Sequence, residues 1–183
     1  RAAVPQMLAM MESAREDGVD VACDVYPYTA GSTQLIHVLP PECQTGGLEQ
    51  LSERLGDAAF RAQLRERMQT GEDFENISLL AGWENIRIAA LAGAEDQKYV
   101  GQSIAALAEK EGKDPFDALF DLLAREHCAV TMIDEIACED DLEAILRDGH
   151  SSIISDSIYP GSGLCHPRVY GTFVRAIERY VRE

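Results

Sequence analysis

The sequence predicts an α/β fold in which a mainly helical insertion interrupts parallel strand–helix units. Short apolar segments rich in β-branched residues alternate with segments of helical periodicity, which favours α/β units over a sandwich of strands. Helical patterns dominate between residues 47 and 127, so this middle part is expected to be the insertion. The 183 residues, of which 46% are hydrophobic, are enough to build a core in one or two domains.

The chain opens on a predicted helix and a predicted strand. Apolar residues recur there at helical spacing, namely Val4, Leu8, Met11 and Ala14. Gly18 is expected to end this helix, and the segment "VDVACDVY" (19–26) is predicted as a strand that stops at Pro27. The segment "TAGST" (29–33) is predicted as a loop, because glycine and serine favour turns.

The insertion is predicted to contain capped helices around one strand. Residues 48–71 are expected to form two short helices that break at Gly56-Asp57, with Asp57 as the N-cap of the second. Residues 84–91 are a strand candidate. Helices at 101–112 and 114–127 are expected to begin at Ser103 and Asp114, which are good N-cap residues.

Strands and helices alternate again in the last part of the chain. The pattern predicts strands at 129–134 and 151–155, with a helix at 139–149 between them. A last helix is expected to start near Thr172, and its apolar stripe consists of Phe173, Ile177, Tyr180 and Val181. No initiator methionine is present and helical patterns run to both ends, so we expect a fragment of a longer polypeptide.

Composition excludes several classes of protein. The net charge of −16 argues against a nucleic-acid surface, which requires clustered lysine and arginine; the basic residues are scattered apart from a small knot at Arg61, Arg65 and Arg67. No segment reaches the roughly 18 apolar residues of a membrane span. The five cysteines are odd in number and contain no Cys-x-x-Cys, which argues against a disulfide framework and favours a reducing, cytoplasmic location.

Two acidic residues lie at or near the ends of predicted strands, where parallel α/β folds gather their functional residues. They are Asp24 in "ACDVYPY" and Asp156 in "IISDS". A carboxylate on an apolar strand is costly unless it is paired, metal-bound or open to a cleft. Asp156 is therefore the stronger candidate for a functional acid. A cap for the turn after the strand is an equally good interpretation.

Other polar residues near these acids are weaker candidates. Arg168 has the planar fork that binds a carboxylate, although a surface arginine before a helix would look the same. Tyr26 and Ser32 offer hydroxyls, although a tyrosine packed under the loop is the alternative. His166 beside Cys165 is not a metal site by itself, since zinc needs three or four ligands. The remaining histidines have no partners at metal spacing; they are His37, His127 and His150.

The motif "DVYPYTAGST", followed at long range by "SD" and by "HPRxYGTF", resembles the N-acyl-D-amino-acid deacylases, or D-aminoacylases, of the amidohydrolase superfamily. The intervening segments "LPPECQTGGLEQLSERL", "GWENIRIA" and "VGQSIAALAEKEGKDPFDALFDLL", and the final "RYVRE", are also similar to that family. The resemblance covers essentially the whole chain, and the paired end motifs are highly specific.

The resemblance implies a fold and a division of the chain. The family has a (β/α)8 barrel with a small β-domain, so the chain is expected to hold partial barrel segments that flank the helical insertion. Residues 1–33 would then supply a barrel helix, a strand and the active-site loop. Residues 34–128 would form a lid-like insertion, and residues 129–183 the last barrel strands and helix.

The resemblance also implies a chemistry. The family uses one or two zinc ions to hydrolyse the amide of an N-acyl-D-amino acid. Asp156 matches the carboxylate that carries the proton from water to the leaving amine, within reach of the metal. Arg168, Tyr26 and Ser32 match positions that recognise the substrate carboxylate.

The chain also departs from the family pattern. Asp156 is followed by Ser157 where the family usually has glycine, and the loop to "HPR" varies in length, which puts the placement of Arg168 in question. The family's His-x-His, its metal-bridging cysteine, two later histidines and a lysine precede "DVYPYTAGST" and have no counterpart here. We therefore expect a fragment that is inactive, binds no zinc by itself and self-associates through exposed barrel surfaces. The alternatives are an autonomous non-catalytic lid or interaction module, and an amidohydrolase of cyclic amides, against which "HPRxYGTF" speaks.

Overall fold

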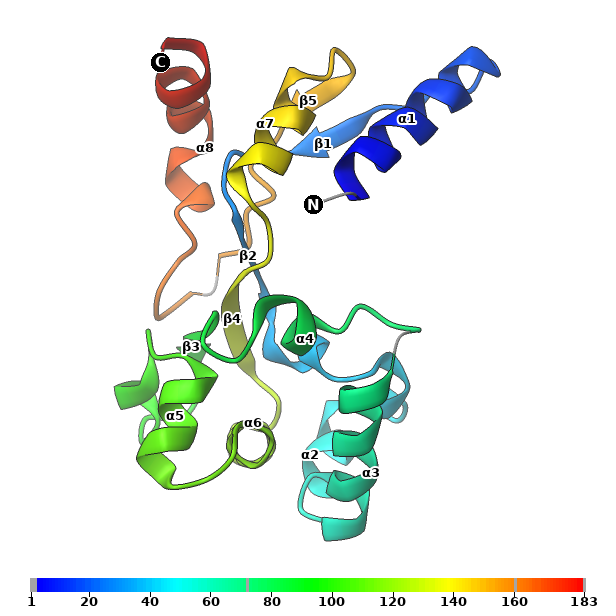
Figure 1. Ribbon diagram of the computed structural model, residues 1–183. Helices are drawn as coiled ribbons and strands as arrows, with labels where there is room; N and C mark the ends of the chain where they lie inside the picture. The colour runs from blue at the N-terminus through cyan, green and yellow to red at the C-terminus, as the bar shows by residue number, and fades with distance from the viewer. Residues whose placement is uncertain (1–2, 72, 160, 183) are drawn as a thin grey trace. The chain divides into compact units, whose positions relative to one another are not determined.

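The computed structural model describes residues 3–71, 73–159 and 161–182 of a mixed α/β protein (Figure 1). The chain divides into two compact units. The first consists of Arg1–Ala30, Ala137–Tyr159 and His166–Glu183, and the second of Gly31–Ile136 and Pro160–Cys165. None of the helices among the described residues is both long and apolar enough to cross a membrane.

The first unit is built on a pair of parallel strands. Strand β1 (Cys23–Val25) pairs with β5 (Ser151–Ile153), and Asp24 lies opposite Ser152. Helix α7 (Glu139–Arg147) precedes β5 and packs against both strands and against α1 (Ala3–Glu16). This parallel pair with a helix on it confirms the parallel strand–helix unit predicted for the two ends of the chain.

Helix α8 (Arg168–Ile177) completes the first unit and continues into a π-helical segment, η4 (Glu178–Arg182). Its buried side chains are Arg168, Thr172 and Ala176, which recur every four residues along one face. The other face carries large exposed apolar residues, namely Tyr170, Phe173, Val174 and Ile177. This unit therefore buries little of the apolar surface of its last helix.

The second unit holds a three-stranded sheet in the order β2–β4–β3. Its strands are β2 (Ala30–Gln34), β3 (Ile86–Leu91) and β4 (Val130–Glu135). Strands β3 and β4 run antiparallel, with Ile86 opposite Asp134 and an irregular register between Ile88 and Ala90. The prediction of parallel strands is therefore wrong for this pair.

The rest of the second unit consists of helices and short 3-10 turns, which supply most of its core. They are η1 (Leu35–Val38), η2 (Pro41–Gln44), α2 (Leu48–Arg54), α3 (Ala58–Thr70), α4 (Ile77–Ala81), η3 (Gln97–Tyr99), α5 (Ile104–Glu111) and α6 (Pro115–Arg125). A continuous apolar cluster includes fully buried Leu35, Leu51, Ile88 and Phe120. A core of this kind is what an independently folding unit requires.

The predicted helix boundaries of the second unit are confirmed by their caps. The Asp57 carboxylate accepts a hydrogen bond from Phe60 N at 2.7 Å, and Ser103 Oγ accepts one from Ala106 N at 3.1 Å. Asp114 accepts from Phe116 N at 2.9 Å and from Asp117 N at 3.3 Å. These side chains satisfy the orphan N–H groups at each helix start, which explains why local sequence located them.

Three local predictions were wrong at the level of single elements. The segment 29–33 is not a loop, because Ala30–Gln34 forms β2 beside β4. The strand predicted at 19–26 is reduced to Cys23–Val25. The last helix begins at Arg168 rather than near Thr172, since Pro167 is preset for a helical start and the His166 ring accepts the Arg168 N–H. All five cysteines are free thiols.

Candidate functional site

Asp156, Arg168 and Tyr26 come together in the first unit. Nη1 of Arg168 lies 3.0 Å from Oδ2 of Asp156 and forms an ion pair with it. Cζ of the same guanidinium lies 4.6 Å from the centroid of the Tyr26 ring, which is a cation–π contact. Three candidates that sequence analysis named separately thus form one cluster.

The parallel pairing of β1 and β5 explains why these residues meet. Tyr26 directly follows the last residue of β1, and Asp156 follows β5 after a short extension. Ile154 N donates to Val25 O at 3.0 Å, so the strands stay together beyond their last paired residues. Because carboxyl ends of parallel strands share one edge, side chains that follow them lie close together.

The backbone of Asp156 adopts a left-handed conformation, with φ of +44°. Few residues other than glycine tolerate this region, and aspartate is among those that do. Its side chain is 53% exposed, whereas that of Arg168 is only 2% exposed. The acid therefore faces solvent with one oxygen held by a buried cation, so it is not buried against a structural partner.

Hydrogen bonds hold the Arg168 backbone on both sides. Its N–H donates to Nδ1 of His166 at 3.0 Å. Its carbonyl accepts from Thr172 Oγ1 at 2.8 Å and from Ser157 Oγ at 3.3 Å. A buried charge is costly unless it is paired and fixed, and these contacts reduce the freedom of the arginine before any ligand arrives.

His166 is buried beside the cluster, with 1% of its surface exposed. Its ring meets Tyr26 and Tyr28 edge-on, at centroid distances of 6.2 and 5.2 Å. Burial, and then the positive charge of Arg168, lower the pKa of His166 to about 4, while the Ala30 backbone acts in the opposite direction. The ring is therefore neutral near pH 7. Sequence analysis assigned this histidine no specific role; its place two residues before Arg168 in "HPR" is the signal it missed.

The two other candidates, Ser32 and Asp24, belong to strands β2 and β1. Ser32 belongs to β2 in the second unit, where it is buried and its hydroxyl donates to the Met132 carbonyl at 2.9 Å. Its predicted contact with a substrate stays a prediction. Asp24 lies in the middle of β1 and is exposed. Nothing in its described surroundings links Asp24 to the function of the candidate cluster.

The residues that the structure describes do not fit a zinc site. No group of three or more His, Cys, Asp or Glu side chains among them is arranged to hold a metal ion. A structural or catalytic zinc needs at least three protein ligands, and Asp156 by itself would supply one carboxylate. His37 is exposed, and Nδ1 of His150 lies 3.7 Å from Asp148, so neither extends the cluster.

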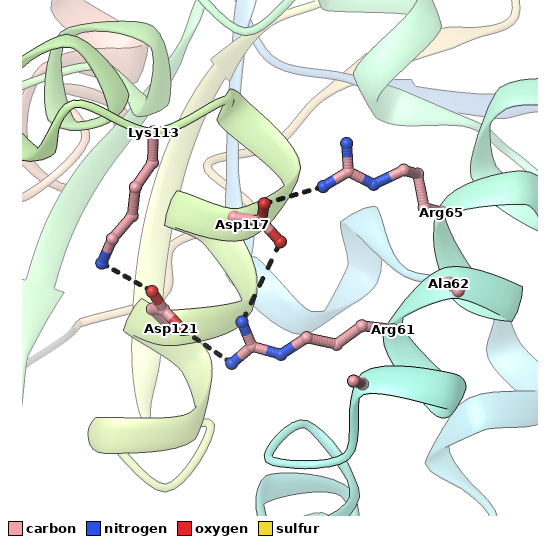
Figure 2. Close-up of a pocket in the computed structure, with 7 residues that line it drawn as sticks. Arg61, Ala62, Arg65, Lys113, Asp117 and Asp121 are labelled. Carbon is pink, nitrogen blue, oxygen red and sulfur yellow. Dashed lines mark hydrogen bonds and ion pairs between the residues drawn. The ribbon is translucent and has the colours of Figure 1, made fainter.

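A charged cleft of about 450 Å³ in the second unit is a competing candidate site (Figure 2). Arg61 and Lys113 both bind Asp121, at 2.6 and 2.7 Å, and Arg65 binds Asp117 at 3.0 Å. Lys113 donates hydrogen bonds to Asp121 and to Glu111, and these bonds raise its pKa, so it stays charged. Every cation of the cleft is already matched by an acid.

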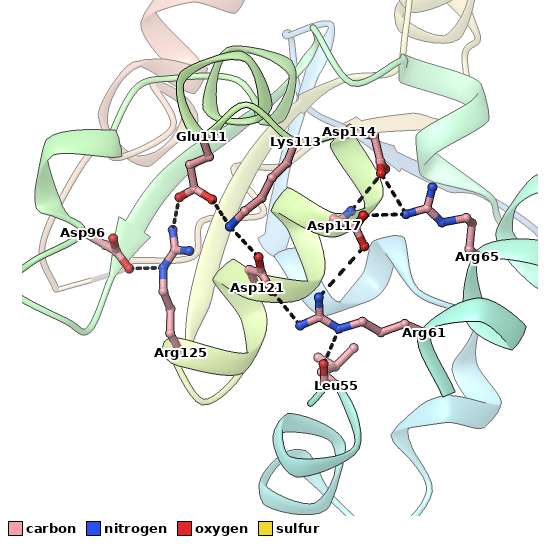
Figure 3. Close-up of polar contacts among 10 residues, drawn as sticks. All are labelled: Leu55, Arg61, Arg65, Asp96, Glu111, Lys113, Asp114, Asp117, Asp121 and Arg125. Atoms are coloured by element: carbon pink, nitrogen blue, oxygen red, sulfur yellow. Dashed lines mark hydrogen bonds and ion pairs between the residues drawn. The ribbon is translucent and has the colours of Figure 1, made fainter. Parts of the chain in front are cut away.

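The same ion pairs continue along α6 as a network (Figure 3). Arg65 also binds Asp114 at 2.9 Å, and Arg125 binds Asp96 at 2.5 Å and Glu111 at 3.0 Å. Two arginines of the basic knot noted in the sequence thus join α3 to α6. We interpret this network as packing of the second unit rather than as a ligand site.

Comparison with known proteins gives a consistent result. No protein-family model matches the chain. An N-acyl-D-glutamate deacylase from Alcaligenes xylosoxydans xylosoxydans is 28% identical over 176 residues, which are 96% of this chain and 26% of the relative. The crystal structure of N-acyl-D-glutamate deacylase from Bordetella bronchiseptica, with zinc and a phosphonate inhibitor that mimics the tetrahedral intermediate, is 27% identical. It matches with a TM-score of 0.64 over 98% of this chain and 28% of that one.

A D-aminoacylase crystal structure is similar to the same extent, at 25% identity and a TM-score of 0.63, over 98% of this chain and 27% of that one. The chain therefore spans about a quarter of the length of the relatives it matches. These matches confirm the resemblance that the end motifs indicated: over nearly its whole length, the chain is similar to one segment of the N-acyl-D-glutamate deacylases and D-aminoacylases.

Proposed function

We propose that this chain is a segment of a metal-dependent amidohydrolase that removes the acyl group from N-acyl-D-amino acids. The observation that carries the proposal is the cluster of Asp156, Arg168 and Tyr26 at the carboxyl ends of two parallel strands. It occurs in a chain that is similar to such deacylases. In this proposal, the cluster supplies carboxylate recognition and proton transfer.

Arg168 is proposed to bind the α-carboxylate of the substrate. A guanidinium is planar, and its N–H groups match the two oxygens of a carboxylate. The Tyr26 ring at 4.6 Å sets the plane of the guanidinium, and burial strengthens its electrostatic attraction for an anion. An arginine held in this way has little rotamer freedom left to lose when a substrate binds.

Asp156 is proposed to carry the proton of the reaction. Its half-exposed carboxylate would take a proton from the attacking water as the new carbon–oxygen bond forms at the amide carbon. It would then deliver that proton to the amide nitrogen as the carbon–nitrogen bond breaks. The products are a carboxylic acid and a D-amino acid. The ion pair to Arg168 would hold the acid beside the bound substrate.

The complete enzyme is proposed to contain zinc, to which Asp156 would contribute one ligand. Because the described residues provide no three-ligand set, we derive no step of the reaction from the metal. The isolated chain is proposed to be inactive and free of zinc, since ligand number sets affinity. Strands β1 and β5 with their helices would belong to a (β/α)8 barrel, and the helical part of the second unit would form its insertion. A cytoplasmic location is part of the same proposal.

The proposal is tested on the complete gene product and on the 183-residue chain. In the complete enzyme supplied with zinc, D156N is expected to lower kcat on N-acetyl-D-glutamate by a factor on the order of 10² to 10⁴ with little change in KM. R168K is expected to raise KM by about tenfold or more, because lysine cannot make the planar contact. The matched controls D140N and R147K, on exposed positions of α7, should stay within about twofold.

Wild-type kcat in D156N would contradict the assignment of the proton carrier. Stoichiometric zinc on the purified 183-residue chain, or turnover by it, would contradict the proposal that the chain is an incomplete enzyme. Hydrolysis of hydantoin in preference to N-acyl-D-amino acids would favour the cyclic-amide alternative.

The second unit favours the alternative of an autonomous module, because it contains its own core and its own ion-pair network. Residues 31–136 expressed alone would decide this point. A cooperative urea transition of that segment would support an independently folding lid or interaction module. An unfolded segment would contradict it.

A further inference from the structure

We propose that His166 is a positioning residue, whose neutral imidazole fixes the backbone turn from which Arg168 reaches the substrate carboxylate. This inference rests on the proposed function, because it assigns Arg168 a substrate to bind. His166 would not touch the reacting atoms. It would act entirely through the arginine two residues later.

A hydrogen bond at the start of α8 links the His166 ring to the Arg168 backbone. Pro167 has no N–H, so the Arg168 N–H is the first donor that the helix presents. Nδ1 of His166 accepts this donor at 3.0 Å, and the His166 carbonyl accepts from Val169 N at 3.1 Å. One residue therefore satisfies two N–H groups of the first helical turn, which otherwise have no partner within the helix. This fixes the point from which the Arg168 side chain leaves the backbone.

The same ring also contacts Tyr26, the residue against which the Arg168 guanidinium lies. The His166 and Tyr26 rings form a T-shaped contact at a centroid distance of 6.2 Å, and the guanidinium of Arg168 lies over the Tyr26 ring. Tyr28 supports the imidazole edge-on at 5.2 Å. Edge-to-face contacts of this kind are directional. His166 therefore contacts the backbone N–H of Arg168 directly and its guanidinium indirectly, through the Tyr26 ring.

The hydrogen bond to Arg168 also requires one protonation state of the His166 ring. Because Nδ1 accepts a hydrogen bond, the proton of the neutral ring lies on Nε2. Nε2 is buried. A second proton on Nδ1 would replace the acceptor by a donor that faces the Arg168 N–H. It would also place a positive charge beside the guanidinium. The ring therefore holds Arg168 only while it is neutral.

The test separates an acceptor from a space-filling side chain. In H166N, the amide oxygen of asparagine takes the place of Nδ1 and keeps an acceptor for the Arg168 N–H. In H166L, a side chain of similar bulk has no acceptor. Two substrates are compared in the complete enzyme: N-acetyl-D-glutamate, and 4-acetamidobutanoate, which lacks only the α-carboxylate. Melting temperatures are measured alongside to exclude unfolded variants.

H166L is expected to raise KM for N-acetyl-D-glutamate by about tenfold, the usual cost of one buried hydrogen bond, while H166N stays within about threefold. The change in kcat/KM for 4-acetamidobutanoate should be less than about twofold, and H166L should have no further effect in an R168M background. If the histidine were merely structural, H166L would lower kcat/KM for both substrates equally, and its effect would add to that of R168M. Either of these outcomes would overturn the proposal.

A measurement that needs no turnover distinguishes failure of this proposal from failure of the proposed function. In the 183-residue chain, amide hydrogen exchange at Arg168 is followed by NMR. H166L should speed this exchange by about tenfold or more, while H166N should stay near wild type. Unchanged exchange in H166L would refute the positioning role. Faster exchange in H166L of this chain, together with a complete enzyme that hydrolyses neither substrate, would refute the deacylase instead.

Discussion

The buried histidine of the first unit should make this chain sensitive to mild acid. His166 contacts the Tyr26 and Tyr28 rings and the backbone of Arg168, and Asp156 is the acid paired with that arginine. Burial and the Arg168 charge lower the pKa of His166 from 6.5 to about 4 in the folded chain. The unfolded chain takes up the proton near the ordinary value. Between these values the unfolded state binds more protons, so stability is complete above pH 6.5 and is lost as the pH falls toward 4.

The magnitude follows from the two pKa values. Each tenfold change in proton affinity is worth about 1.4 kcal/mol, so the drop from 6.5 to about 4 is worth about 3 kcal/mol at most. Between pH 7 and pH 4.5, most of this is lost, which is about 2.5 kcal/mol. For a domain of ordinary stability, that is a large part of the free energy of unfolding.

Urea denaturation near pH 7 and near pH 4.5 measures this loss, with H166N as the comparison. Asparagine does not titrate. The pH dependence of stability in H166N therefore keeps the contribution of the carboxylates and loses that of His166. The wild-type free energy of unfolding should fall by about 2 kcal/mol more than that of H166N over this interval. Parallel pH dependences of the two proteins would refute the reasoning, as would an NMR titration of His166 with a pKa near 6.5.

Three further predictions concern other parts of the chain. D114A should lower the free energy of unfolding by about 1 to 2 kcal/mol in urea denaturation, because α6 loses its N-cap, whereas D114N keeps an oxygen for the cap and should cost less; equal losses would contradict the role of the cap. Burial raises the pKa of Cys43 to about 11, so a thiol reagent near pH 8 should label Cys43 more slowly than the partly exposed Cys165 in the folded chain. Equal labelling rates in the folded chain would contradict this prediction. The apolar face of α8 should make the chain self-associate, so F173S combined with I177S should shift its elution on size exclusion toward the monomer; a monomeric wild type would contradict that prediction.

The sequence was most informative where structure depends on residues close together in the chain. Helix starts at Asp57, Ser103 and Asp114 were predicted correctly because each cap binds N–H groups two or three residues away. The same local view failed for "TAGST". Its glycine and serine favour a turn, but pairing beside β4 makes it a strand. The segment itself does not indicate that its strand partner lies 100 residues later in the chain.

The candidate site divides in the same way. Asp156 and Arg168 were identifiable as an acid after a strand and an arginine in a specific motif, but their ion pair depends on where β5 and α8 are brought by the fold. His166 was the residue most undervalued in the sequence, because a lone histidine is more often structural, although its place two residues before Arg168 marked it. Its importance comes from three contacts, of which only the one to Arg168 is local.

By itself the sequence determined the alternation of strands and helices, the caps and the similarity to deacylases, since these depend on periodicity, short-range hydrogen bonds and motif identity. Only the tertiary structure decided that Tyr26, Asp156 and Arg168 form one cluster and that the imidazole beside them is neutral. The physical reason is that ion pairing, stacking and burial depend on distances between segments far apart in the chain. Such distances are set by parallel pairing of β1 with β5, which the residues of either strand do not specify alone.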